Sequence, residues 1–243
     1  MTGPVHGDAP SLLPPQLGRV WGTDEHARKR GRRPSLDLEM IVTTAAEFAD
    51  SDGIASLSLV RLAELLHVSA NALYRYLDSR DELDVLLREH ALALPPAPAS
   101  GTDWKVGARD WAHRLRSRYL AHPWLADLRL TVPVTPNALG WLEALLAALE
   151  SSPLPRPDIL RAAALLDGFV RAHFVSQRDV AAWAAHPLSE EDLVERVAPL
   201  LDVRGYGRVA TMFRSGRYQQ PTAETHEREF DYGLERILLG LAA

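Results

Sequence analysis

Residues 58–76, SLVRLAELLHVSANALYRY, constrain the fold of this chain more than any other stretch. Apolar side chains recur at helical spacing on both sides of a short interruption, which predicts two short helices joined by a tight turn. Ser58 and Ser69 precede the two apolar runs, where each can cap the free backbone N–H groups of the following helix. His67 and Val68 fill the turn. This pattern is typical of a helix-turn-helix, whose second helix enters the DNA major groove.

The second of these helices has two chemically different sides. At about 100° per residue, Ala72, Leu73 and Tyr76 fall on one side and can seal a small core. The opposite side consists of Ala70, Asn71, Tyr74 and Arg75. Amide and guanidinium groups can bond base edges, and a phenol can donate to a phosphate. A helix that merely turns a polar face to water would look the same, so the neighbouring segments decide between the two interpretations.

Helices are expected on both sides of this stretch. An apolar stripe runs over residues 38–49, and the pattern ends at Gly53, which suits a left-handed position after a helix. Residues 78–82, DSRDE, are expected to begin another helix. Acidic side chains in the first turn stabilise a helix through their interaction with its dipole. Arg80 places a cation in the same turn, where the helix dipole disfavours positive charge. A DNA phosphate close to Arg80 would explain its presence.

Residues 36–90 resemble the DNA-binding domain of TetR-family transcriptional repressors. The resemblance rests, without a gap, on the segments AEFADSDGI, SLVRLAELLHVSANALYRYL and SRDELDVLL. It implies a three-helix module, with a fourth helix linking it to the rest, that works as a dimer on a near-palindromic DNA operator. The DNA-binding residues carried over from the family are Ser58, Ser69, Ala70, Asn71, Tyr74, Arg75, Tyr76 and Arg80.

The chain departs from the family pattern at three positions. His67 stands where many members have Gly, and His tolerates a positive φ better than most residues, at some strain. Leu59 and Val60 replace more polar residues, so the helix before the turn is expected to make fewer DNA contacts. Base readout would then be concentrated on Asn71 and Arg75.

The charge distribution is unusual for a DNA-binding chain. The net charge is −5, and the first 94 residues carry 10 basic and 14 acidic side chains. Basic charge is nevertheless concentrated in residues 28–33, RKRGRR, directly before the DNA module. Such an arm can lie across phosphates or enter the minor groove, with Arg32 and Arg33 as the candidate contacts. The alternative is a solubilising tail.

These features divide the chain into three parts. Residues 1–34 are expected to be a disordered tail with the basic arm, because their first part is rich in Gly and Pro. The DNA-binding domain is assigned to 35–94. The prolines of residues 91–101, ALALPPAPASG, cannot continue a helix, so a boundary is placed there. Residues 95–243 show helical patterns with almost no strand signals. The expected fold class is all-α, with an N-terminal helix-turn-helix domain and a larger C-terminal helical domain for ligand binding and dimerisation.

Helices of the second domain are expected over 103–122, 123–130, 137–150, 158–185, 189–215 (one or two) and 222–241. Residues 102–128 and 136–149 resemble, more loosely, the ligand-binding C-terminal domains of tetracycline-repressor-like regulators. This resemblance implies that two helices, 158–185 and 222–241, pair with their copies in a homodimer. The first of them is apolar around most of its circumference, which a symmetric dimer explains.

A small-molecule site is expected in the second domain. Aromatic side chains with a few polar groups among them are how such pockets are built. Trp111, Trp141, Phe169 and His173 are the candidate ligand-binding residues, and ordinary core packing is the alternative. The effector would be a small hydrophobic or amphipathic molecule.

Other classes of function lack signals. The chain has no cysteine, no metal-ligand spacing and no nucleophile or phosphate-binding motif, so no enzymatic activity, cofactor or metal is expected. No long apolar run or secretory signal occurs, and the expected location is the cytoplasm of a prokaryote. The expected function is a homodimeric repressor released from DNA by a ligand. The alternatives are a ligand-independent architectural DNA-binding protein and a small-molecule-binding protein without a DNA function.

Overall fold

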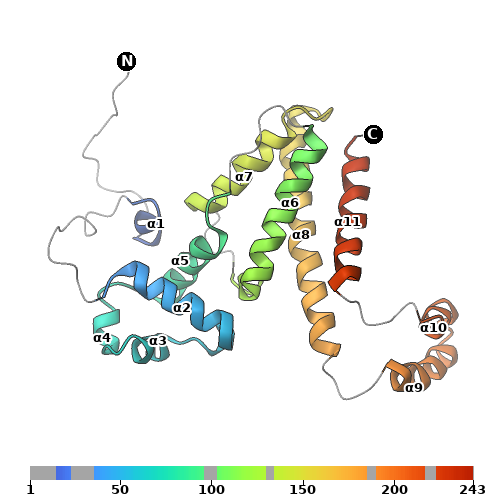
Figure 1. Cartoon of the computed structure of the whole chain (residues 1–243), viewed down its shortest axis with the longest axis horizontal. Helices are drawn as coiled ribbons and strands as arrows, with labels where there is room; N and C mark the ends of the chain where they lie inside the picture. Colours follow the sequence, from blue (N-terminus) through green and yellow to red (C-terminus); the bar gives the residue numbers. More distant parts are fainter. Residues whose placement is uncertain are drawn as a thin grey trace. The chain divides into compact units, whose positions relative to one another are not determined.

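The computed structural model describes residues 15–22, 36–95, 103–129, 134–184, 190–216 and 223–242. Every regular element in these ranges is a helix, which confirms the all-α prediction (Figure 1). The chain forms two compact units, residues 1–163 and 164–243. No helix within the described ranges has the length and apolar character needed to span a membrane.

The first unit contains the predicted DNA-binding module and the helices that follow it. Its elements are α1 (Pro15–Val20), α2 (Leu38–Asp52), η2 (Ile54–Ser56), α3 (Leu59–Leu65), α4 (Ala70–Leu73), α5 (Arg80–Leu92), α6 (Trp104–Ala121), η3 (Pro123–Ala126) and α7 (Pro136–Leu149). The boundary predicted after residue 94 falls inside this unit, because α5 packs against both α6 and α7.

Four N-caps start the helices of the DNA-binding module. Asp37, Ser58, Ser69 and Ser79 each accept a hydrogen bond from the backbone N–H three residues further on, over 2.8, 3.0, 3.2 and 3.1 Å. These bonds satisfy donors that a helix leaves free in its first turn. The caps predicted at Ser58 and Ser69 are thereby confirmed.

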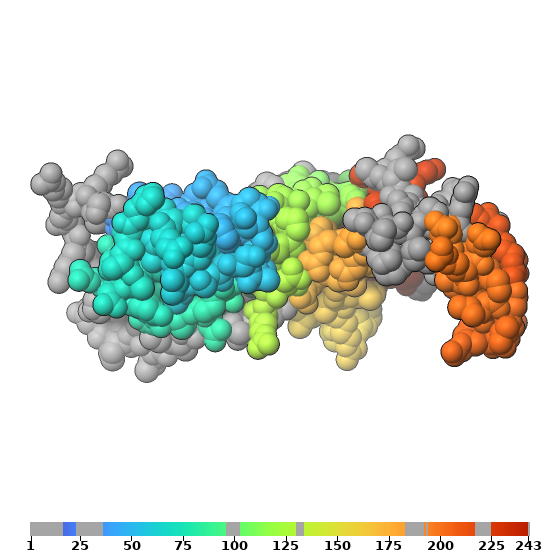
Figure 2. Space-filling model, turned by 90° about the horizontal axis from the view of Figure 1, so that it is seen from below, coloured from blue at the N-terminus to red at the C-terminus, as the bar shows by residue number. Residues whose placement is uncertain are grey.

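Fully buried aliphatic side chains from α2 to α5 form the core of the module. The ones that are at most 1% exposed include Ile41, Leu62, Leu73, Leu77, Leu83 and Leu87. Each buried leucine stabilises the fold by about 1.5–3 kcal/mol relative to an exposed one. The space-filling view shows the blue residues of α2 beside the cyan residues of α3 on one face of the module (Figure 2).

One part of the predicted disordered tail is folded. A disordered segment is expected over 1–34, but residues 15–20 form α1, which packs on α5. Leu17 and Gly18 are buried there, so the apolar contact with α5 orders this segment. Apart from residues 15–22, the tail, including the basic arm with Arg32 and Arg33, lies outside the described residues.

Helices α6 and α7 pack against each other in the first unit (Figure 1). Helix α6 occupies the range predicted for it and buries one apolar side, which consists of Trp104, Ala108, Trp111, Leu115 and Tyr119. Gly107 lies so close to α7 that a Cβ at that position would be 3.2 Å from the Cβ of Ala148. The contact between the two helices is therefore tight.

The regular elements among the described residues of the second unit are helices. Its elements are α8 (Arg156–Ala184, whose first turns belong to the first unit), α9 (Glu190–Val203), α10 (Gly207–Arg214) and α11 (Ala223–Gly240). Helices α9 and α10 form a hairpin, in which Gly205 turns the chain with a φ of 74°. The region expected to hold one or two helices over 189–215 thus holds two.

Candidate nucleic-acid interface

The predicted recognition helix is a single helical turn followed by a tighter turn. Residues 70–73 form α4, and the N–H groups of Arg75 and Tyr76 bond three residues back, to Ala72 at 3.3 Å and Leu73 at 2.9 Å. Leu73 and Leu77 are 1% and 0% exposed. These two leucines anchor the segment to the core, so its outer side has a defined orientation.

The outer side of this segment is the polar side that the sequence predicts. Asn71, Tyr74 and Arg75 are exposed, whereas Ala70 is half-buried against the neighbouring structure. On the inner side Leu73 is fully buried, and its companions Ala72 and Tyr76 are half-buried. The predicted division into two sides is therefore present in the fold. Contact of the outer side with DNA stays a prediction, as do the contacts of Ser58 and Ser69.

The turn between α3 and α4 has the predicted left-handed residue. His67 has a φ of 55° and is exposed. The N–H of Val68 bonds to the carbonyl of Ala63 at 3.0 Å, which closes the turn behind it. A non-glycine residue with this backbone costs about 1–2 kcal/mol, so the turn is held by the packing on both sides.

Arg80 already has three acceptors within the protein. Its Nε donates to Asp84 at 2.7 Å, its Nη2 donates to the carbonyl of Ile54 at 3.3 Å, and its Nη1 donates to the carbonyl of Leu57. The side chain therefore fastens the start of α5 to the segment before α3. The phosphate contact expected of Arg80 remains a prediction beside this structural role.

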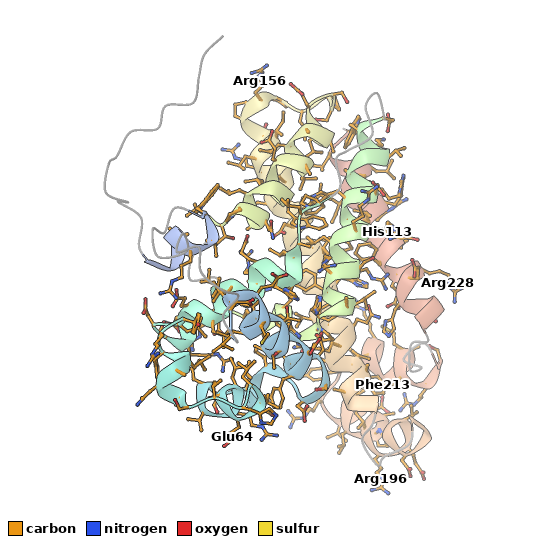
Figure 3. The ribbon with its side chains drawn as sticks, turned by 60° about the vertical axis from the view of Figure 1, so that its left-hand side comes forward. Glu64, His113, Arg156, Arg196, Phe213 and Arg228 are labelled. Carbon is orange, nitrogen blue, oxygen red and sulfur yellow. The ribbon has the colours of Figure 1, made fainter. Side chains whose placement is uncertain are left out.

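Charges on α3 are paired at its surface. Arg61 and Glu64 form an ion pair at 3.0 Å, and Glu64 lies at the outer surface of the module (Figure 3). An exposed pair of this kind contributes little to stability. Pairing nevertheless makes this part of α3 less cationic, which leaves Arg75 as the cation on the exposed side of the recognition segment.

Polar contacts join the DNA-binding module to the helices after it, and sequence reasoning missed them. The carboxylate of Asp50, at the end of α2, accepts from Trp124 Nε1 at 2.6 Å and lies 2.9 Å from His122 Nδ1. Glu89 accepts from the backbone N–H of Asn137 at 2.8 Å, and the side chain of Asn137 donates back to its carbonyl at 2.8 Å. The sequence signals for these contacts are weak, because His122–Pro123 reads simply as a helix end.

Nearby, His90 on α5 has an altered titration. Burial lowers the pKa of His90 below 6.5, and the neighbouring His122 and Arg118 lower it further. The rings of His90 and His122 are 6.4 Å apart. Arg118 also donates to the carbonyl of Ala91 at 2.6 Å, which fixes its guanidinium where α5 meets α6.

Two of the candidate ligand-binding residues lie together in the first unit. Trp111 and Trp141 meet edge to face with their rings 5.9 Å apart, and each is 5% exposed. Trp111 Nε1 donates to the carbonyl of Trp141 at 2.8 Å, and Trp141 Nε1 donates to that of Ala93 at 3.0 Å. Packing alone therefore accounts for both tryptophans, and ligand contact by them stays a prediction.

The other two candidates lie together in the second unit. Phe169 and His173 on α8 have ring centroids 5.7 Å apart, and Phe230 of α11 lies 5.4 Å from the first and 5.2 Å from the second. Phe230, which sequence reasoning missed, is fully buried. One turn beyond His173, the buried amide oxygen of Gln177 has no hydrogen-bond partner among the described residues. The aromatic cluster and this unpartnered amide oxygen therefore lie about one helical turn apart along α8.

Comparison with known proteins defines the class. Residues 97–243 match the family described as tetracyclin repressor-like, C-terminal domain. The repressor DrrR1 of Streptomyces coeruleorubidus is 29% identical over 238 residues, which cover 93% of this chain and 84% of DrrR1. An HTH-type transcriptional regulator of Saccharopolyspora erythraea is 33% identical over 159 residues, 63% of this chain and 65% of that protein.

Solved structures agree with this assignment. The structure of the Streptomyces coelicolor TetR family protein ActR in complex with actinorhodin has a TM-score of 0.69 and 27% identity, covering 85% of this chain and 96% of ActR. The fold and the helix-turn-helix define a DNA-binding transcriptional regulator with a helical C-terminal domain. The chain belongs to the TetR family of transcriptional regulators.

Proposed function

We propose that this chain is a homodimeric repressor that binds a near-palindromic operator and leaves it when a small hydrophobic or amphipathic effector binds. The observation that carries the proposal is the recognition surface, defined as the exposed side chains of Asn71, Tyr74 and Arg75. Two buried leucines and the Ser69 cap hold this surface toward solvent.

The chemistry of the recognition surface suits a DNA major groove. An amide such as that of Asn71 can bond adenine bidentately, and a guanidinium such as that of Arg75 can bond guanine. The phenol of Tyr74, 53% exposed, can donate to a phosphate and fix the register of the helix. Half-buried Ala70 at the start of α4 leaves room for the bases to approach.

A homodimer would place two such surfaces on one operator. Half-sites about one helical turn of DNA apart, roughly 34 Å, require two recognition segments on one assembly. Apolar side chains of α8 and α11 that remain exposed in the single chain support an interface there: Leu165, Val180, Tyr232 and Leu239.

The effector site is proposed for the C-terminal region. Structures of the similar protein ActR in complex with actinorhodin and with (S)-DNPA support a small-molecule effector. The cluster of Phe169, His173 and Phe230 offers aromatic surface, and the amide oxygen of Gln177 offers an acceptor for a donor on the ligand. Trp111 and Trp141 remain candidates as well.

The proposal is tested by selecting DNA from a random pool with the purified protein. A palindromic sequence should emerge, and Asn71→Ala or Arg75→Ala should lose about 1–3 kcal/mol of preference at individual base pairs. Arg114→Ala is the matched control, because it removes the same charge from the surface ion pair with Asp110 on α6, a helix given no role in DNA contact or dimerisation. Its binding should equal that of the wild type.

Two outcomes would favour the alternatives. If no sequence is enriched from the pool, and Asn71→Ala and Arg75→Ala bind DNA as the wild type does, the chain is a small-molecule-binding protein without a DNA function. A selected operator that no compound of the expected class releases, with actinorhodin as the first probe, would indicate an architectural DNA-binding protein. The coupling between ligand and DNA cannot exceed the ligand's preference for the released state.

A further inference from the structure

The short helix α1 reaches the end of the recognition segment. Arg19 of α1 donates to the backbone carbonyl of Tyr76 and forms ion pairs with Glu82 at 3.1 Å and Asp78 at 3.3 Å. Its side chain is only 18% exposed. Residues 76–82 are the junction through which the recognition segment passes into α5, so one guanidinium holds both ends of this junction.

Glu82 explains why the cation is needed there. Its side chain is 3% exposed, and its Oε2 accepts from the backbone N–H of Asp78 at 2.6 Å. A buried carboxylate is costly unless a cation and hydrogen bonds compensate it. Arg19 supplies the cation from a segment 63 residues earlier in the chain. The buried carboxylate of Glu82 on α5 therefore holds α1 in place through Arg19.

The other end of the same segment contacts the region before α7. Trp21 Nε1 donates to the carbonyl of Val134 at 2.9 Å, two residues ahead of Pro136, where α7 begins. Arg19 and Trp21 are separated by a single residue in the chain. Residues 15–22 thus connect the recognition junction with the start of a helix that follows the DNA-binding module.

We propose that residues 15–22 are a strap that orients the recognition surface and couples it to the start of α7, with Arg19 as its positioning residue. The proposal rests on the proposed function, because it assigns a role in DNA binding. Arg19 acts through the protein: its guanidinium faces Tyr76, Asp78 and Glu82 and is largely covered.

Hydrogen exchange tests the orienting role without DNA. Arg19→Gln should raise the exchange rates of the amides of residues 76–82 about tenfold, because local opening there becomes easier. Arg114→Gln, which removes a cation from a surface ion pair of α6, should leave them unchanged. Arg19→Lys keeps a charge near Glu82 with fewer donors and should give an intermediate rate. Equal rates in the wild type and Arg19→Gln would overturn the strap.

Salt dependence of DNA binding separates positioning from direct phosphate contact. Arg19→Gln should weaken binding to the selected operator about tenfold with an unchanged slope of log K against log salt, because no phosphate contact is removed. A slope lowered by about one unit would mean that Arg19 itself contacts a phosphate and would refute the positioning role. If the wild-type protein enriches no DNA sequence from the random pool, the proposed function is refuted instead.

Coupling to α7 is tested with Trp21→Phe, which keeps a ring and removes the indole donor. DNA binding by the wild type should change the exchange of the amides of residues 134–135, since coupling between two sites is reciprocal. In Trp21→Phe that change should fall by about half or more, with 76–82 still protected. If DNA changes the exchange of these amides equally in the wild type and in Trp21→Phe, the hydrogen bond of Trp21 does not couple the recognition surface to α7.

Discussion

Replacing Asp50 with alanine removes the carboxylate that joins the last turn of α2 to η3. The indole Nε1 of Trp124 donates to it at 2.6 Å, and the imidazole of His122 lies 2.9 Å away. Trp124 is 3% exposed, so its N–H would lose its acceptor where water has little access. The substitution thus tests whether this contact holds the DNA-binding module to the helices that follow.

The magnitude follows from the burial of the two donors. A buried donor left without an acceptor costs about 1–3 kcal/mol, and bonds to a charged group lie toward the upper part of the range. His122 is half-buried and adds less. We expect Asp50→Ala to lower the free energy of unfolding by about 2 kcal/mol, which for a chain of this size lowers Tm by roughly 4–8 °C.

A double-mutant cycle measures the contact itself. Trp124→Phe retains an aromatic ring and removes the donor, so the double variant should cost about 1–2 kcal/mol less than the sum of the single ones. Urea unfolding should be followed at one fixed protein concentration, because dimerisation shifts apparent stability. Glu47→Ala, on the exposed side of the same helix, is the control. Costs that add to within about 0.5 kcal/mol would refute the contact.

Three further predictions concern other parts of the chain. His67→Gly removes a left-handed non-glycine residue with a φ of 55° and should raise the free energy of unfolding by about 0.5–1 kcal/mol, measured in urea; a decrease would contradict the strain assigned to this turn. Gly233→Ala would place a Cβ 2.7 Å from the ring of Phe169 and should lower the free energy of unfolding by about 1–3 kcal/mol. It should also weaken the dimer in sedimentation. An unchanged Tm would contradict the close contact between α8 and α11 at this position. Because burial and His122 lower the pKa of His90, the unfolded chain binds more protons, so stability present above pH 6.5 should be lost as the pH falls through the lowered pKa. Urea midpoints across this range should show that His90→Gln flattens the loss, and an equal slope in both proteins would exclude His90 as its source.

Local features of the DNA-binding module were predictable because their causes lie within a few residues. Ser58 and Ser69 accept from N–H groups three positions away. His67 turns the chain where the apolar pattern breaks, and the spacing of the leucines sets which side is buried. The recognition helix was predicted too long, through Tyr76, because periodicity does not distinguish an α-helical turn from the tighter turn that ends it.

The candidate ligand residues show where such reasoning stops. Trp111 and Trp141 are candidates by sequence because they are aromatic residues with polar groups nearby in the chain, yet each indole N–H donates to a backbone carbonyl. Composition cannot reveal these partners, since they come from other elements. Phe230 was missed for the same reason, because its neighbours Phe169 and His173 lie about 60 residues earlier in the chain.

By itself the sequence determined most helices of the DNA-binding module, the caps at Ser58 and Ser69, the left-handed turn and the polar outer side of the recognition segment. These follow from hydrogen bonds and periodicities that span at most a few residues. Only the tertiary structure decided that Arg19 neutralises Glu82 and that Asp50 receives Trp124, across 63 and 74 residues of chain. Such pairs form because packing buries a charge or a donor and then requires a partner, which any distant segment that packs there can supply.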